Sequence, residues 1–465
     1  MKFLSLLVLA LSLFAKDEFF FEKPYLQLGD RPTMAAQGAL DLMWLGHDKD
    51  VAYTVEYKTA KAWIPATPKM LRRVDFAGTA PHRVYSAALT KLKPGATFTY
   101  RISVAGKPVF ESSSVARKAA NQDSHFVVFG DCAANTAGQR QVAFHAAQQK
   151  PDYVFITGDI VYSRGRVSEY QTNFWPVYNN ETASPTEGAP ILRNTLFAAA
   201  VGNHDSQPEI DTTKNPDPLA YYFYWNQPSN GPALNAGGKH VPHFTGDDAL
   251  KNKFLETAKG NFPGMANFSF DYANVHWTVI DSNSYVDWTD TELRAWVEKD
   301  LKAAAKAKWR LVAFHHPPFN SSKAAHFKEQ RLRVLSDLLE KYKVDLVLSG
   351  HVHDYQRTFP LTFETQPGFV LGKNQEVPGK WTLDKAYDGE KNTKPKGVIY
   401  ITTGAGGAGQ YPKEYNVGPD YWQEFTTRFV AFPHSFSVID TTAKQLTFRQ
   451  INADGKEVDR FVITR

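Results

Sequence analysis

The chain has 465 residues, more than one hydrophobic core usually supports, so we expect two domains. Its 53 Lys and Arg residues against 48 Asp and Glu residues give a net charge of +5 without a basic run, so we predict no nucleic-acid partner. The single cysteine, Cys132, excludes an internal disulfide framework and cysteine-rich zinc sites. Any metal must therefore be held by Asp, His, Asn or Tyr.

Residues 1–15 are typical of a secretory signal peptide, with Lys2 followed by an apolar run that ends at the small residue Ala15. That run is too short to span a membrane, and no later apolar run is long enough to do so. We expect cleavage after Ala15 and a secreted or periplasmic protein.

Between residues 23 and 117 the sequence alternates apolar and polar residues in short runs separated by turns such as Lys93-Pro94-Gly95. Beta-branched and aromatic residues dominate these runs, and no helical period is present. The pattern predicts a small all-β sandwich over 23–117.

From about residue 122 onward, apolar strands alternate with helices, which predicts a layered α/β domain over 122–465. We expect helices near 139–150, 289–306 and 327–342, the second one capped by Thr289 and Glu292 in a capping box. The Pro- and Gly-rich segment 205–265 has no clear period and is expected to overhang the strand ends. The predicted strands span 125–129, 153–156, 196–201, 275–280, 311–314, 344–348 and 398–401.

Most of these strands end at residues that can bind a cation. Three strands run through glycine into Asp131, into Asp159 with Tyr162, and into Asn203-His204. Ligands gather at the carboxyl ends of strands in open α/β sheets. We therefore expect oxygen and nitrogen ligands for two neighbouring metals. Two further strands deliver histidines, His315 from the one and His351 with His353 from the other.

These motifs resemble the metallophosphoesterases and, within them, the purple acid phosphatases. The resemblance rests on five blocks in order, and it implies a four-layer αββα metallophosphoesterase sandwich preceded by a fibronectin type III-like all-β sandwich. Closing segments such as 397–404 and His434-Ser435-Phe436 also look like that family. The blocks are Gly130-Asp131, Gly158-Asp159-x-x-Tyr162, Gly202-Asn203-His204, His315-x-Pro317 and Gly350-His351-x-His353.

The resemblance also implies how the ligands are shared between the two ions. Asp131, Tyr162 and His353 would hold Fe(III), and Asp159 would bridge to a second ion. Asn203, His315 and His351 would hold that second ion, Fe(II), Zn(II) or Mn(II). The chemistry agrees, because a phenolate favours Fe(III) whereas neutral amide and imidazole ligands suit a divalent metal.

We expect an exported phosphatase that hydrolyses small phosphate monoesters by attack of metal-bound hydroxide. His204 and His326 are the candidates for binding phosphate and protonating the leaving alcohol. Phosphodiesters or nucleotides are the alternative substrates, and an inactive binding or scaffold protein is the alternative of another class. The chain departs from the family pattern at Cys132-Ala133, where a glycine is usual, and at Ala325-His326, where a histidine pair is frequent.

Several residues keep a second interpretation. Tyr162 could be a packing tyrosine, and His204 could orient a ligand rather than touch substrate. His316 is expected to orient a ligand or face solvent.

Residues 404–409 match the dinucleotide fingerprint G-x-G-x-x-G, but the prolines beyond them disfavour the helix that such a site needs. We interpret them as a flexible loop near the metal site.

Overall fold

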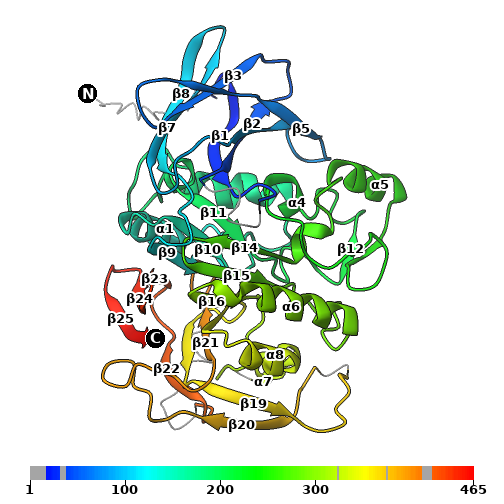
Figure 1. Ribbon diagram of the computed structural model, residues 1–465. Coiled ribbons are helices and arrows are strands. Elements are labelled where there is room, and N and C mark those ends of the chain that lie inside the picture. Colours follow the sequence, from blue (N-terminus) through cyan, green and yellow to red (C-terminus); the bar gives the residue numbers. More distant parts are fainter. Residues whose placement is uncertain (1–16, 32–37, 322–323, 373–374, 411–421) are drawn as a thin grey trace, which may run out of the picture.

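The computed structural model describes residues 17–31, 38–321, 324–372, 375–410 and 422–465. The predicted leader at 1–15 lies outside them. Within these residues the chain forms a β-rich end stacked on a larger α/β part (Figure 1). No helix in the described ranges is both long enough and apolar enough to cross a membrane.

A ten-stranded sheet and a seven-stranded sheet form the centre of the molecule. The ten-stranded sheet has the order β25-β24-β23-β9-β10-β11-β1-β2-β6-β5, and the seven-stranded sheet has the order β14-β15-β16-β17-β21-β18-β22. In the α/β part the strands of the first sheet are β9 (Ser124–Phe129), β10 (Tyr153–Ile156), β11 (Leu196–Ala199), β23 (Ser435–Thr441), β24 (Gln445–Asn452) and β25 (Glu457–Thr464). Those of the second are β14 (Phe268–Tyr272), β15 (Val275–Val279), β16 (Trp309–Ala313), β17 (Leu346–Ser349), β18 (Tyr355–Thr358), β21 (Ile399–Thr403) and β22 (Thr426–Val430).

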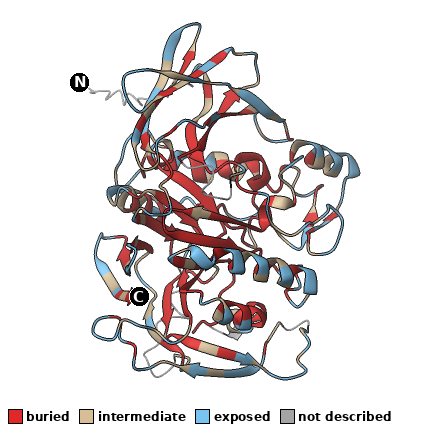
Figure 2. Cartoon of the chain, viewed as in Figure 1, coloured by how far each residue is buried: buried red, intermediate tan, exposed pale blue. Residues whose placement is uncertain are grey.

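The two sheets pack face to face, with helices on their outer faces. Between them the rings of Phe155 and Trp277 stack 4.6 Å apart. Val142 of α1 (Ala137–Gln148) belongs to the core on the outer face of the ten-stranded sheet. Val297 of α6 (Thr291–Ala303) belongs to the core against the seven-stranded sheet, as does Leu339 of α8 (Ser336–Lys341). The buried residues concentrate along these central layers (Figure 2), which confirms the predicted layered α/β domain.

Smaller elements connect these layers. The short helices are α2 (Val167–Glu169), α3 (Trp175–Tyr178), α4 (Tyr221–Tyr224), α5 (Asp248–Thr257) and α7 (Ala324–Phe327). Two short strand pairs stand apart from the main sheets, namely β12 (Glu209–Asp211) with β13 (His243–Thr245), and β19 (Leu361–Thr365) with β20 (Gly379–Leu383).

The N-terminal strands form two facing sheets. One is the four-stranded sheet β4-β3-β7-β8, and the other is the β1-β2-β6-β5 end of the ten-stranded sheet. They enclose a core of their own, in which Trp44 stacks on Tyr85 at 5.4 Å. The strands are β1 (Phe20–Gln27), β2 (Leu40–His47), β3 (Tyr53–Lys58), β4 (Ile64–Ala66), β5 (Lys69–Val74), β6 (His82–Leu89), β7 (Thr97–Val104) and β8 (Lys107–Val115).

The sandwich is continuous with the α/β part through β1. This strand pairs in parallel with β11, with Leu26 opposite Leu196 and Gln27 opposite Phe197. One sheet therefore crosses the predicted boundary between 117 and 122. The division into two domains stays a prediction, because a shared sheet joins two separate cores.

Part of the segment 205–265 fastens this junction instead of lying free over the strand ends. The Tyr25 hydroxyl donates to the Tyr224 carbonyl at 2.8 Å, and His82 Nε2 lies 3.0 Å from the Tyr224 hydroxyl. Phe223 of α4 stacks on Phe76 of the sandwich at 5.4 Å. Phe223 and Tyr224 of α4 are buried against the sandwich, a contact that no local pattern reveals.

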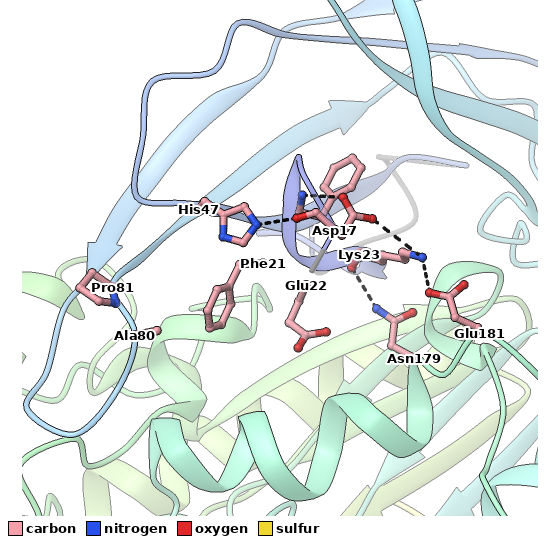
Figure 3. Close-up of a pocket in the computed structure, with 10 residues that line it drawn as sticks. Asp17, Phe21, Glu22, Lys23, His47, Ala80, Pro81, Asn179 and Glu181 are labelled. Carbon is pink, nitrogen blue, oxygen red and sulfur yellow. Dashed lines mark hydrogen bonds and ion pairs between the residues drawn. The ribbon is translucent and has the colours of Figure 1, made fainter. Parts of the chain in front are cut away.

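A cavity of about 340 Å³ lies at the same junction (Figure 3). Phe21, Glu22 and His47 face it, and the Lys23 ammonium lies between the carboxylates of Asp17 and Glu181. None of the predicted metal ligands lines this cavity, so it is not the candidate metal site.

Two helix predictions were wrong in detail. Asp290, not Thr289, caps α6, since its carboxylate accepts the N–H groups of Glu292 at 2.9 Å and Leu293 at 3.2 Å. The Thr289 hydroxyl instead donates to Asp287 at 2.7 Å. The predicted helix over 327–342 is interrupted, because the Gln330 N–H donates to the Gln375 carbonyl and a 3₁₀ turn, Arg331–Leu335, precedes α8.

Candidate metal centre

The predicted ligand residues meet where parallel strands of both sheets end. Strands β9, β10 and β11 are parallel neighbours in the ten-stranded sheet, and β16 and β17 are parallel neighbours in the seven-stranded sheet. Asp131, Asp159 and His315 follow three of these strands and are fully or almost fully buried. The carboxyl ends of the two sheets therefore supply one common site.

The first group of donor atoms surrounds the Tyr162 hydroxyl. Its oxygen lies 3.0 Å from Asp131 Oδ1, 3.1 Å from Asp159 Oδ2 and 3.1 Å from His353 Nε2. Ligands about 2.1 Å from a six-coordinate cation lie about 3 Å from one another, so this spacing fits a metal. The structure thus brings together the four residues predicted to surround the ferric ion.

The second group surrounds the side-chain oxygen of Asn203. Asn203 Oδ1 lies 3.1 Å from His315 Nε2 and 2.9 Å from His351 Nδ1. His315 Nε2 also lies 3.2 Å from Asp159 Oδ1. These are the residues predicted to surround the divalent ion.

Asp159 belongs to both groups through different oxygens. Oδ2 faces Tyr162, whereas Oδ1 faces His315 and also accepts the His204 N–H at 2.8 Å. A carboxylate with one oxygen toward each donor group has the geometry of a bridging ligand.

Backbone conformation at these positions is unusual. Asp131, Asp159 and His351 have φ values of 55°, 50° and 68°, in the left-handed region that non-glycine residues rarely adopt. Such conformations cluster at functional sites, where the surrounding structure holds them. Each of the three follows a glycine at the end of its strand.

Two glycines are required by close packing around the carboxylates. A Cβ atom at Gly202 would lie 2.1 Å from Asp159 Oδ1, and one at Gly350 would lie 2.4 Å from Asp131 Oδ2. Any larger side chain would displace a candidate ligand. This explains why glycine precedes the donor residue at these strand ends.

The glycine-rich loop 404–409 packs against the residues that follow β9. The Ala408 N–H donates to the Asp131 carbonyl at 2.7 Å, and the Gly409 carbonyl accepts from His353 Nδ1 at 2.7 Å. A Cβ atom at Gly406 would lie 2.3 Å from the Gly130 carbonyl oxygen. The loop lies near the metal site as expected, and its glycines serve this close approach. Residues 411–421, which follow it, lie outside the described ranges.

The two candidate proton donors lie beside different ligand residues. The His204 ring stacks against Tyr162 with centroids 4.5 Å apart, and its Nδ1 donates to the Ser163 carbonyl at 2.8 Å. The His326 ring lies 5.0 Å from the His351 ring. The His204 side chain is 32% exposed, so it can meet a molecule that arrives from solvent.

His316 is buried beneath the second donor group. Its Nδ1 lies 2.8 Å from the Ser282 hydroxyl, and its ring lies 4.3 Å from that of His351. Burial, with the nearby Arg331 charge, holds the pKa of His316 well below its usual value. A neutral His316 supports the neighbouring histidines by packing, and it is not a solvated neighbour.

The anionic oxygens of the first group need a cation. Burial and the charges of Asp131 and Asp159 raise the pKa of the Tyr162 phenol well above its usual value, so the protein alone keeps it protonated. Two buried carboxylates and a phenol oxygen within about 3 Å fit a highly charged metal, which would displace the phenol proton. The donor set therefore fits a metal centre.

Two acids beyond the predicted metal ligands lie at this centre, Asp205, which the sequence indicated as a capping acid, and Glu329, which it did not. Asp205 accepts the N–H groups of Gly202 at 2.9 Å and Ile160 at 3.0 Å, which fixes two strand exits. Burial and the Asp159 charge raise its pKa to about 8. Glu329 Oε2 lies 2.6 Å from His351 Nε2. A capping role for Asp205 is visible in its position after Asn203-His204, whereas Glu329 lies in a polar run that is typical of a solvated surface.

Comparisons with known proteins agree with this geometry. A family model described as calcineurin-like phosphoesterase matches residues 124–355. Purple acid phosphatase 23 of Arabidopsis thaliana is 25% identical over 341 residues, which cover 70% of this chain and 62% of the relative. Purple acid phosphatase 13 of the same plant is 23% identical over 367 residues, covering 74% and 59%. The matches thus span about three-fifths of the length of these relatives.

Solved structures share the fold. The purple acid phosphatase PPD1 from yellow lupin seeds matches 95% of this chain and 74% of its own, with a TM-score of 0.62 and 19% identity. A structure of PhoD covers 95% of this chain and 88% of its own, with a TM-score of 0.56 and 11% identity. The class is therefore that of the calcineurin-like phosphoesterases. Within this class the chain is similar to the purple acid phosphatases.

Proposed function

We propose that this chain is a dinuclear metal-dependent phosphatase that hydrolyses small phosphate monoesters. The observation that carries the proposal is that the Asp159 carboxylate turns one oxygen toward each donor group. A shared carboxylate between two such groups is what a pair of ions about 3.5–4 Å apart requires. When bound, the ions would activate water and polarise the phosphoryl oxygens.

The metals would be Fe(III) with Fe(II), Zn(II) or Mn(II). A phenolate at Tyr162, together with Asp131, suits a trivalent ion, and Asn203 with His315 and His351 suits a divalent one. Such ions carry five positive charges against three from Asp131, Asp159 and the phenolate. The surplus of two positive charges favours an anionic phosphate ester.

The chain's own residues would bind the ester and supply a proton. His204 stands beside the Tyr162 side of the site, and His326 stands beside the His351 side. A histidine beside each of these ligand residues could bind phosphate oxygens and protonate the departing alcohol. The exposed His204 side chain supports a role in meeting substrate.

Hydrolysis of phosphodiesters or nucleotides is the alternative activity, because the same donor set serves both ester types. An inactive binding protein is the alternative of another class, and one relative is named a probable inactive purple acid phosphatase 1. The complete convergence of ligand residues favours the enzyme. Export to the periplasm or the outside of the cell is part of the proposal and rests on the sequence of residues 1–15.

Metal analysis combined with a substrate panel tests the proposal. We expect two metal ions per chain, broad visible absorption from a tyrosinate–Fe(III) pair, and hydrolysis of p-nitrophenyl phosphate. Faster cleavage of bis(p-nitrophenyl) phosphate than of the monoester would select the diesterase alternative. A protein that binds no metal and cleaves neither ester would contradict the enzyme.

A further inference from the structure

The three histidines of the metal centre are oriented in two different ways. His315 Nδ1 donates to the Thr157 carbonyl at 3.0 Å, and His353 Nδ1 donates to the Gly409 carbonyl at 2.7 Å. Both partners are backbone atoms. His351 Nε2 instead lies 2.6 Å from the carboxylate of Glu329.

The Glu329 contact determines which nitrogen of His351 can bind a metal. A carboxylate accepts the Nε2 proton, so the lone pair of a neutral imidazole remains on Nδ1. That nitrogen lies 2.9 Å from Asn203 Oδ1, inside the second donor group. A charged acceptor also makes the imidazole a stronger ligand.

Glu329 is held in place by the segment that carries it. The Val377 N–H donates to Gln330 Oε1 at 3.1 Å, and the Gln330 N–H donates to the Gln375 carbonyl at 3.2 Å. Arg331, which is 3% exposed, also contacts the Gln375 side chain. These tertiary bonds interrupt the helix predicted over 327–342 and leave the carboxylate facing His351.

We propose that Glu329 is a positioning residue that fixes the tautomer and orientation of His351 and thereby sets the affinity of the divalent ion. The proposal rests on the proposed function, because it concerns one of its two metals. His316, Glu329 and His351 lie close enough together to suggest a third cation site. The 2.6 Å contact instead indicates that His351 keeps its proton on Nε2 and donates it in a hydrogen bond to Glu329, so that nitrogen cannot bind a metal.

The test compares divalent metal affinity in three variants. Glu329→Ala removes the acceptor, and Glu329→Gln keeps an uncharged acceptor of the same size. Glu376→Ala is the matched control, since Glu376 lies in the loop that braces Gln330 but pairs with the exposed Lys328 at 3.4 Å. Zinc dissociation constants would be measured by competition with a chromophoric chelator on protein that retains its ferric ion.

Loss of a hydrogen-bonded acceptor behind a metal-binding histidine costs about 10–100-fold in affinity. We expect a loss in this range for Glu329→Ala, a smaller loss for Glu329→Gln, and none for Glu376→Ala. The visible band should stay in place in every variant, because Tyr162, Asp131 and His353 are untouched. Thermal unfolding of the metal-free proteins would show whether the Glu329→Ala variant folds. If it does not fold, the zinc dissociation constant of the Glu329→Gln variant provides the test.

Two results would overturn the inference while leaving the proposed function intact. One is zinc affinity in Glu329→Ala within about twofold of the wild type, and the other is equal loss of the ferric ion and the divalent ion. A wild-type protein that binds no metal would instead remove the proposed function itself.

Discussion

The two sheets contribute different kinds of donor to the metal centre. The ten-stranded sheet supplies oxygen donors, from Asp131 after β9, from Asp159 and Tyr162 after β10, and from Asn203 after β11. The seven-stranded sheet supplies nitrogen donors, from His315 after β16 and from His351 and His353 after β17.

Each donor group draws on both sheets. The first donor group joins Asp131 and Tyr162 to His353, and the second joins Asn203 to His315 and His351. The ions would therefore connect the two sheets at one end, while the core between them holds the rest of their length.

Loss of the bridging carboxylate should have the largest effect. Asp159→Asn keeps the size of the side chain but removes the charge shared by the two donor groups. We expect phosphatase activity to fall about 1000-fold, equivalent to about 4 kcal/mol of transition-state stabilisation. Metal content and p-nitrophenyl phosphate hydrolysis would be measured beside Asp211→Asn, an acid that pairs with the exposed Lys214. Activity above a tenth of the wild type would contradict a bridging role.

Removal of the metals should lower stability, because ions bound by both donor groups would connect the two sheets only in the folded state. A ligand present at about 1000 times its dissociation constant stabilises a fold by about 4 kcal/mol. We expect the melting temperature to fall on chelation and to recover on reloading. Identical melting curves before and after verified metal removal would show that the sheets need no such connection.

The donor residues at the strand ends could be predicted because the signal for each lies in a few adjacent residues. An apolar run, a glycine and a donor residue occupy adjacent positions, as in Gly158-Asp159 and Gly350-His351. The glycine is needed where a Cβ atom would strike a neighbouring carboxylate, as at Gly350. Local chemistry therefore predicted which residues converge.

The contacts that sequence reasoning missed connect distant segments. Glu329 reaches His351 across 22 residues, and its Lys-Glu-Gln-Arg context is typical of solvated helix. The pairing of β1 with β11 extends the ten-stranded sheet into the sandwich, and no alternation pattern encodes that register. Such features depend on how whole sheets meet, which local periodicity does not specify.

The sandwich end of the ten-stranded sheet should lose stability in acid through the buried histidine His82. Burial, partly offset by the bond to the Ala80 carbonyl, lowers the pKa of His82 to about 4 from 6.5. The unfolded chain therefore takes up the proton first, and stability falls as pH drops from about 6.5 to 4. The full effect is about 3 kcal/mol.

Urea unfolding between pH 4 and pH 7 would measure this loss. His82→Gln should flatten that part of the pH dependence, whereas His243→Gln, at an exposed position, should leave it as in the wild type. Equal pH slopes for the wild type and His82→Gln would show that acid acts elsewhere in the molecule.

The smallest effect on rate is expected where an oxygen donor can be removed without breaking the bridge. Tyr162→Phe deletes the phenol oxygen but leaves Asp131, His353 and both oxygens of Asp159. The visible band should disappear, because it requires a phenolate bound to Fe(III), and activity should fall only about tenfold, or about 1.4 kcal/mol. Absorption spectra of iron-loaded protein would be recorded beside kcat for p-nitrophenyl phosphate. If the colour persists, Tyr162 is a packing tyrosine and the ten-stranded sheet supplies only Asp131, Asp159 and Asn203.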